Sequence, residues 1–138
     1  MNEKQIKHLE FIQNIITRMN TNSFLLKSWT VIIVSALFAL SLKNENLDHL
    51  LIALTLLPIL VFWGLDGYFL RQERLFRALY DEVRGKDEKY VDFCMDTNTV
   101  QKKVTSWFNV TCSKTIFPYY GIICIVVLVI LITSFFLL

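Results

Sequence analysis

The sequence has few residues of the kinds that form metal sites, disulfides or catalytic centres. Its 138 residues include two histidines, His8 and His49, and three cysteines that show no CxxC or Cys/His spacing. A metal site or a disulfide framework is therefore not expected, and free thiols are the simpler interpretation. No Gly-rich phosphate loop, GxSxG or HExxH motif occurs. We expect no enzyme activity and no cofactor.

Charge is also scarce. Charged residues make up 19% of the chain and hydrophobic residues 54%, with a net charge of +2. So small a basic excess does not suggest a nucleic-acid duplex as partner. A soluble domain of this length could not bury so much contiguous apolar sequence, which indicates an integral membrane protein.

Three apolar segments have the length of transmembrane helices. They cover residues 24–42, 50–70 and 116–138. The first would rise about 28 Å as a helix, close to the thickness of a hydrocarbon core. Because a long polar and amphipathic segment precedes it, we interpret it as a permanent anchor and not as a signal peptide. Pro58 is expected to bend the second span.

Residues 1–23 repeat apolar side chains at helical spacing, which predicts an amphipathic helix. Asn20–Ser23 has the composition of a turn and N-cap before the first span. The predicted fold is an all-α membrane protein. It comprises a cytosolic amphipathic helix (1–23), a transmembrane hairpin (24–70), a small, mainly helical cytosolic module (71–115) and a C-terminal transmembrane helix (116–138).

The distribution of lysine and arginine predicts the orientation. The N-terminal flank holds four, the loop between the first two spans holds only Lys43, and the segment from Arg71 to Lys114 holds nine. The positive-inside rule then places the N-terminus and the central module in the cytosol. We expect a multi-pass protein of the bacterial inner membrane with its C-terminus outside.

The central module is predicted to contain three elements. Arg71–Arg84 continues the second span as a helix that ends at Gly85. Tyr90–Asp96 alternates apolar and polar residues, which indicates a short strand or an extended piece. Asn98–Asn109 returns to helical spacing, with Asp96 or Thr97 as its cap.

Asp66 is the one acidic residue within a predicted span. An ionised group in a membrane is costly and needs a named partner. In an antiparallel hairpin Lys27 would lie at the same depth. Two interpretations stay open: an intramembrane ion pair between Lys27 and Asp66 that fixes the hairpin, or an acid that lines or gates an ion path.

One face of the second span and its continuation carries polar residues. The candidate pore or gate residues on this face are Thr55, Phe62, Asp66 and Glu73, and Arg77 follows them one turn later. Rings of acidic side chains form cation-selective vestibules. Three spans cannot enclose a pore alone, so conduction would require a homo-oligomer.

Arg71, Arg74, Arg77 and Arg84 form a basic group after the second span. They can be the positive-inside flank, a contact for anionic membrane lipid, or a site for a phosphate-bearing ligand such as a nucleotide signal. Neighbouring acidic residues at helical spacing could neutralise several of them.

The hairpin, the crossover FWGLDGYFLRQERLFRALYDEV and the short module together resemble the small bacterial inner-membrane proteins of the SLATT-like kind. The resemblance is one of layout over roughly 9–84. It implies a two-helix hairpin that continues into a cytosolic helix, and an association with nucleotide signalling or antiphage defence.

Two functions follow as hypotheses. The first is a homo-oligomeric inner-membrane effector that conducts ions or perturbs the membrane when a cytosolic protein or nucleotide signal releases it. The alternative is a non-conducting membrane scaffold that recruits a cytosolic protein through residues 71–115.

Overall fold

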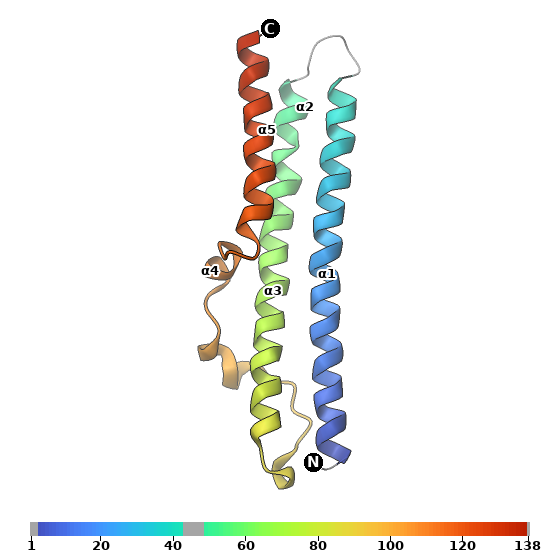
Figure 1. The fold of residues 1–138 in the computed structure, drawn as a ribbon, viewed down its shortest axis with the longest axis vertical. Coiled ribbons are helices and arrows are strands. Elements are labelled where there is room, and N and C mark those ends of the chain that lie inside the picture. The colour runs from blue at the N-terminus through green and yellow to red at the C-terminus, as the bar shows by residue number, and fades with distance from the viewer. Residues whose placement is uncertain (1–2, 43–48, 138) are drawn as a thin grey trace.

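Long antiparallel helices dominate the computed structural model, which describes residues 3–42 and 49–137. In this part of the chain the α-helices are α1 (Glu3–Ser41), α2 (His49–Leu54), α3 (Leu56–Gly85), α4 (Trp107–Thr111) and α5 (Phe117–Leu137). Two short 3₁₀ helices, η1 (Glu88–Tyr90) and η2 (Asn98–Lys103), lie between α3 and α4. In Figure 1, α1 runs beside α2 and α3, and α5 lies against α2 and the adjoining part of α3. Lys43 lies outside the described residues.

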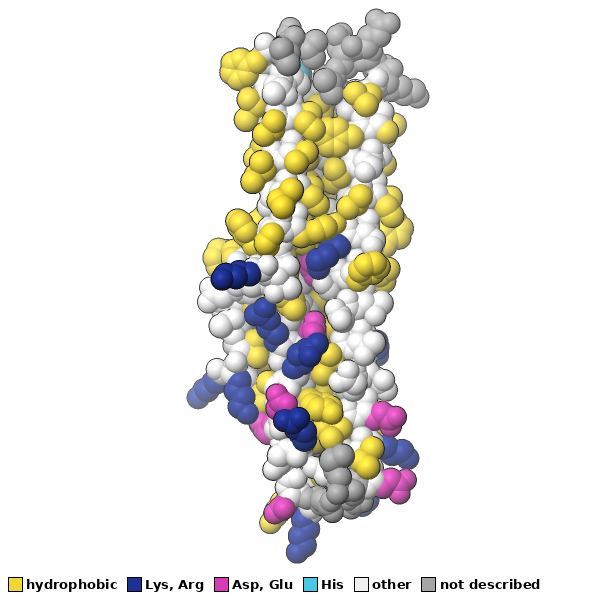
Figure 2. All heavy atoms as spheres, in the orientation of Figure 1, with side chains coloured by type: hydrophobic (Ala, Val, Ile, Leu, Met, Phe, Trp, Pro, Cys, Tyr) yellow, Lys and Arg dark blue, Asp and Glu magenta, His cyan; other side chains and the backbone are white. Residues whose placement is uncertain are grey.

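The predicted all-α fold is confirmed, and three helical stretches are long and apolar enough to cross a membrane. On the face shown in Figure 2, hydrophobic side chains cover one half of the molecule, while Lys, Arg, Asp and Glu gather on the other. We call residues 24–42, 49–65 and 117–137 the apolar half, and residues 3–22 and 67–116 the charged half. Many apolar side chains of the apolar half point outward, as a lipid-facing surface requires.

Each half has its own core. In the charged half, α1 and α3 pack through a continuous apolar seam joined by η2. Its buried residues are Leu9, Ile12, Ile16, Leu75, Leu79, Val83 and Val100. In the apolar half, α2, α3 and α5 enclose Ile52, Ile59, Tyr120 and Val127, and Ile116, just before α5, joins this core from the boundary. The helical spacing of apolar residues therefore continues on both sides of the boundary.

The prediction of a turn at Asn20–Ser23 is wrong, because these residues lie inside α1, a single helix of 39 residues. Such a helix is about 58 Å long. The hydroxyls of Thr17 and Thr21 each donate to a carbonyl four residues earlier, at 3.0 Å, which satisfies these polar side chains within the helix. Packing along α3 therefore outweighs the weak turn preference of these residues. The predicted amphipathic helix and first span are one element.

The second span is interrupted near the predicted bend. α2 ends at Leu54, Thr55 forms a turn, and α3 begins at Leu56. Pro58 lacks the backbone N–H that would bond to the Leu54 carbonyl, which explains why the helix breaks one turn before the proline. The Thr55 hydroxyl donates to the Ile52 carbonyl at 2.7 Å and satisfies one group freed at the break.

The segment 86–106, which we call the return segment, differs most from expectation. No β-strand forms in the described residues, and 91–97 has no regular secondary structure, with Phe93 in the left-handed region. The predicted helix over Asn98–Asn109 is replaced by η2, an extended stretch and α4. An isolated strand is unstable alone. His8 of α1 instead contacts the segment, since its Nε2 lies 3.1 Å from the Cys94 carbonyl oxygen.

Aspartate side chains order the return segment locally. The Cys94 amide donates to Asp92 at 3.1 Å, and this bond lowers the pKa of the exposed Asp92 carboxyl below its usual value. The Asn98 amide donates to Asp96 at 3.0 Å at the start of η2. Asp96, one residue before the N-cap Thr97, therefore accepts a bond from the first residue of the 3₁₀ helix that replaces the predicted α-helix.

Close contact between α3 and α4 depends on Gly67. A Cβ atom at Gly67 would lie 2.0 Å from Oγ1 and 3.2 Å from the Cα of Thr111, whereas one at Gly64 would lie 3.4 Å from the Trp107 ring. The backbone of α4 therefore approaches α3 only where no side chain intervenes.

We expect Gly67→Ala to destabilise the protein by about 1–3 kcal/mol, because α4 must move away from α3. Gly64→Ala is the matched control. Its higher helix propensity can raise the free energy of unfolding by up to about 1 kcal/mol, so we expect this variant to be at least as stable as wild type. Thermal unfolding in detergent, followed by circular dichroism and tryptophan fluorescence, checks both. Equal melting temperatures for the two variants would contradict the close contact.

Candidate functional site

A buried charged cluster lies where the apolar and charged halves meet. Asp66 of α3 is 0% exposed, and its Oδ2 lies 2.5 Å from Nζ of Lys27 on α1. Ser23, one turn before Lys27, donates a hydrogen bond to Oδ1 of Asp66, and Lys27 donates to the Ser23 hydroxyl at 2.8 Å. The structure thus brings together Lys27 and Asp66, and adds Ser23, which the sequence analysis missed.

The two charges differ in their access to the outside. The Lys27 side chain is 25% exposed, whereas the Asp66 side chain is fully buried. A lysine at this position can direct its ammonium group toward the edge of the apolar half, while the carboxylate has no such route. Asp66 therefore depends on Lys27 and Ser23 more than Lys27 depends on Asp66.

α5 is joined to this cluster by hydrogen bonding and ring packing. The Tyr119 hydroxyl donates to the Lys27 carbonyl at 2.8 Å. Tyr120 is fully buried, and its ring stacks on Trp63 with centroids 6.0 Å apart. The Tyr120 ring therefore fills the core between α3 and α5.

Two indole groups attach α4 to the same level of α3. Trp63 donates to the Thr111 carbonyl at 2.9 Å, and Trp107 donates to the Gly64 carbonyl at 3.0 Å. These two bonds and the bond from Tyr119 to Lys27 lie at the end of the apolar half. This arrangement satisfies backbone groups at the end of the apolar half, where unpaired ones would be costly.

The candidate pore residues do not form an outward face. Thr55 and Asp66 are fully buried, Glu73 is 8% exposed and Phe62 is half-buried, all within one chain. The polar members have partners, since Thr55 bonds to Ile52 and Glu73 pairs with Arg77 at 2.7 Å. In the single chain, the polar residues of this face are therefore buried by packing within the chain.

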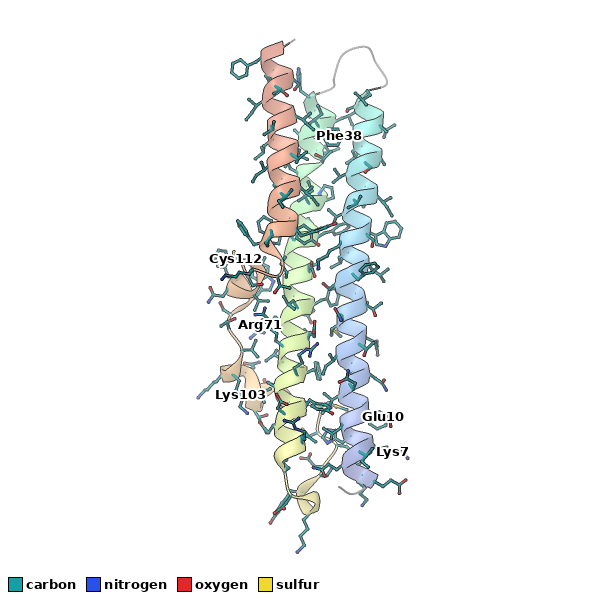
Figure 3. The ribbon with its side chains drawn as sticks, viewed as in Figure 1. Lys7, Glu10, Phe38, Arg71, Lys103 and Cys112 are labelled. Carbon is teal, nitrogen blue, oxygen red and sulfur yellow. The ribbon has the colours of Figure 1, made fainter. Side chains whose placement is uncertain are left out.

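The four candidate arginines have different surroundings. Arg71 donates to the Thr105 carbonyl at 3.3 Å, and Arg84 lies 3.7 Å from Asp81. Arg74 and Arg77 line one pocket together with Lys103, which sequence reasoning missed. Figure 3 shows Arg71 and Lys103 on the side of α3 that the return segment follows. No sequence signal placed η2 beside α3.

In the described residues, no group of three His, Cys, Asp or Glu side chains could hold a metal ion. His8 packs in the charged half, while His49 lies 2.9 Å from the Ser134 hydroxyl in the apolar half. Cys94, Cys112 and Cys124 are free.

Comparison with protein-family models, curated proteins and solved structures finds no match to this chain. The class of this protein therefore follows from its physical features alone. It is an all-helical protein with three helices able to cross a membrane and a charged helical extension. The buried cluster of Ser23, Lys27 and Asp66 marks the boundary.

We expect Lys27→Met to destabilise the protein by about 3 kcal/mol, because it leaves a buried carboxylate without its counter-ion. Asp66→Asn should cost less, since Lys27 can reach the edge of the apolar half. The double variant Lys27→Met/Asp66→Asn should recover much of the loss. Thermal unfolding in detergent measures all three, with exposed Lys7→Met as a control expected within about 0.5 kcal/mol of wild type. Strictly additive losses in the double variant would show that the two charges are not coupled.

Proposed function

We propose that this chain is a multi-pass protein of the bacterial inner membrane that does not conduct ions and recruits a cytosolic protein through its charged half. The recruiting part would comprise residues 71–115 together with the first turns of α1, which pack against them. In this arrangement the apolar half is the anchor, and the charged half projects into the cytosol, as the distribution of lysine and arginine favours.

The observation that carries this proposal is an aromatic pair exposed at the end of the charged half. Phe11 of α1 and Phe93 of the return segment are 49% and 39% exposed, with ring centroids 6.3 Å apart. Their position is remote from the apolar half. Exposed aromatic side chains are enriched at protein interfaces, so a partner protein is a suitable cover for them.

The backbone of Phe93 has a strained conformation. Its φ of 55° lies in the left-handed region, which costs a residue with a side chain about 1–2 kcal/mol. The Phe93 ring lies 5.4 Å from that of His8, which fixes it against α1. A strained backbone that presents a partly exposed aromatic ring favours a binding role over a purely structural one.

The burial of the polar face supports the non-conducting part of the proposal. Thr55, Asp66 and Glu73 all have partners within the chain. An ion path along this face would require α1 and α3 to separate and the Lys27–Asp66 pair to break. Breaking such a buried pair costs several kcal/mol.

The second candidate is a homo-oligomeric effector that conducts ions after such a separation. The observation that favours it is a charged cluster inside a largely apolar bundle, since ionisable groups in membranes are often functional. Ser35 and Ala39 are exposed small residues on one face of α1, which would allow close contact between copies. A role in antiphage defence rests on the SLATT-like layout.

A photo-reactive amino acid in place of Phe11 or Phe93, in the full chain in cells, tests recruitment. We expect a discrete adduct with one other protein from both positions, because both rings would be covered by it. Replacement of Asn20, an exposed residue of α1 outside the recruiting part, is the control and should give no such adduct. Adducts only between copies of this chain, or none, would overturn recruitment through this surface.

Liposome flux distinguishes the two candidates. We expect wild-type protein and Asp66→Asn to give no cation flux above protein-free vesicles, because the polar face is closed within each chain. Native mass in detergent accompanies the assay. A ring-sized oligomer with flux that Asp66→Asn and Glu73→Ala both reduce would replace the scaffold proposal with the conducting one.

A further inference from the structure

A basic pocket lies in the charged half between α3 and the return segment. Its volume is about 360 Å³. Arg74 and Arg77 line it from α3, and Lys103 and Val104 line it from the end of η2 and the residue after it. The volume falls in the range of small-molecule sites. This pocket is separate from the aromatic pair and from the Lys27–Asp66 cluster.

Cations dominate the pocket lining. Arg74, Arg77 and Lys103 face a single carboxylate, Asp81, which also lies 3.7 Å from Arg84. Two of these cations also form ion pairs with carboxylates outside the pocket lining. Arg77 pairs with Glu73 at 2.7 Å, and Lys103 pairs with Glu82 at 3.4 Å.

Arg74 differs from the other two cations. Among the residues that the structure describes, its guanidinium has no hydrogen bond and no ion pair, although the side chain is half-buried. An arginine that is partly removed from water and lacks a carboxylate partner leaves its planar set of donors unused.

We propose that this pocket binds the phosphate group of a phosphate ester. A guanidinium donates two parallel hydrogen bonds to phosphate oxygens, and Arg74 and Arg77 lie three residues apart on one helix face. Lys103 supplies a point charge from the opposite wall. Ala78 and Val104 add an apolar surface for the carbon atoms of the ester. The ligand is either the headgroup of an anionic lipid or a soluble nucleotide.

The position of the pocket allows both sources. Arg74 lies eight residues beyond Asp66 on α3, a rise of about 12 Å. With the apolar half in a bilayer, this distance corresponds to the headgroup region and its aqueous edge. The site is independent of protein recruitment, so either proposal can fail without the other.

The antiparallel register supplies a matched control. Gln5 bonds to the Val83 carbonyl, and Lys27 pairs with Asp66, so Arg18 of α1 lies at nearly the same level as Arg74. Arg18 is exposed and does not line the pocket. Removing Arg18 therefore removes the same charge at a similar depth and leaves the site intact.

Native mass spectrometry of the full chain in detergent tests the site with two probes, phosphatidylglycerol and ATP, against phosphatidylcholine as the reference lipid. For the probe that binds, we expect Arg74→Ala and Lys103→Ala to raise the dissociation constant at least about tenfold, since each removes a charged hydrogen bond. Arg18→Ala should change it less than about twofold. Asp81→Asn should lower the dissociation constant, because the substitution removes the one carboxylate of the pocket lining. Unchanged circular dichroism shows that each variant is folded.

The outcomes distinguish a lipid headgroup from a soluble nucleotide as the ligand. Binding of ATP alone assigns the pocket to a soluble nucleotide, binding of phosphatidylglycerol alone assigns it to lipid, and binding of both assigns it to the phosphate group that they share. The proposal is overturned if neither probe binds more tightly than phosphatidylcholine. It is equally overturned if Arg18→Ala weakens binding as much as Arg74→Ala, since bulk charge would then explain the effect.

Discussion

The burial of the Asp66 carboxylate is the constraint on which the hairpin depends. A charge removed from water is tolerated only with a counter-ion and hydrogen bonds. Lys27 and Ser23, one turn apart on α1, supply both. Because each residue along a helix turns by about 100°, a shift of α1 by one residue would carry both groups away from Asp66. The contact of Gln5 with Val83 at the far end of α3 is consistent with the same register.

This register lets the single helix pair α1 and α3 pack in both the apolar half and the charged half. The apolar seam of α1 and α3 continues past the charged cluster into the charged half, where Ile12 and Leu75 are buried. Thr55, just before α3, and Glu73 of α3 are buried, and each has a partner within the chain. Outward surfaces are left to apolar side chains in one half and to charged ones in the other. The arrangement gives an apolar half with a charged helical extension, and the buried polar side chains Thr55, Asp66 and Glu73 have partners inside the chain.

The return segment adds chemistry that the helix pair lacks. Phe93 of this segment lies against His8 of α1, and its η2 helix brings Lys103 beside α3. Immediately after the segment, α4 packs closely on α3 at Gly67, and α5 bonds to α1 through Tyr119. The exposed aromatic pair and the basic pocket are thus formed by different residues of one extension.

The sequence by itself determined the three apolar helices and the pairing of Lys27 with Asp66, because these depend on composition and on helical spacing. It left the start of the helix after Asp96 open between Asp96 and Thr97, and the structure shows the Asn98 amide bonded to Asp96. It did not determine that α1 passes through Asn20–Ser23 without a turn, since packing on α3 outweighs local preference there. Only the tertiary structure decided the path of the return segment and the position of Lys103. The contact between His8 and Cys94 joins residues 86 positions apart, and local periodicity carries no information about such a contact.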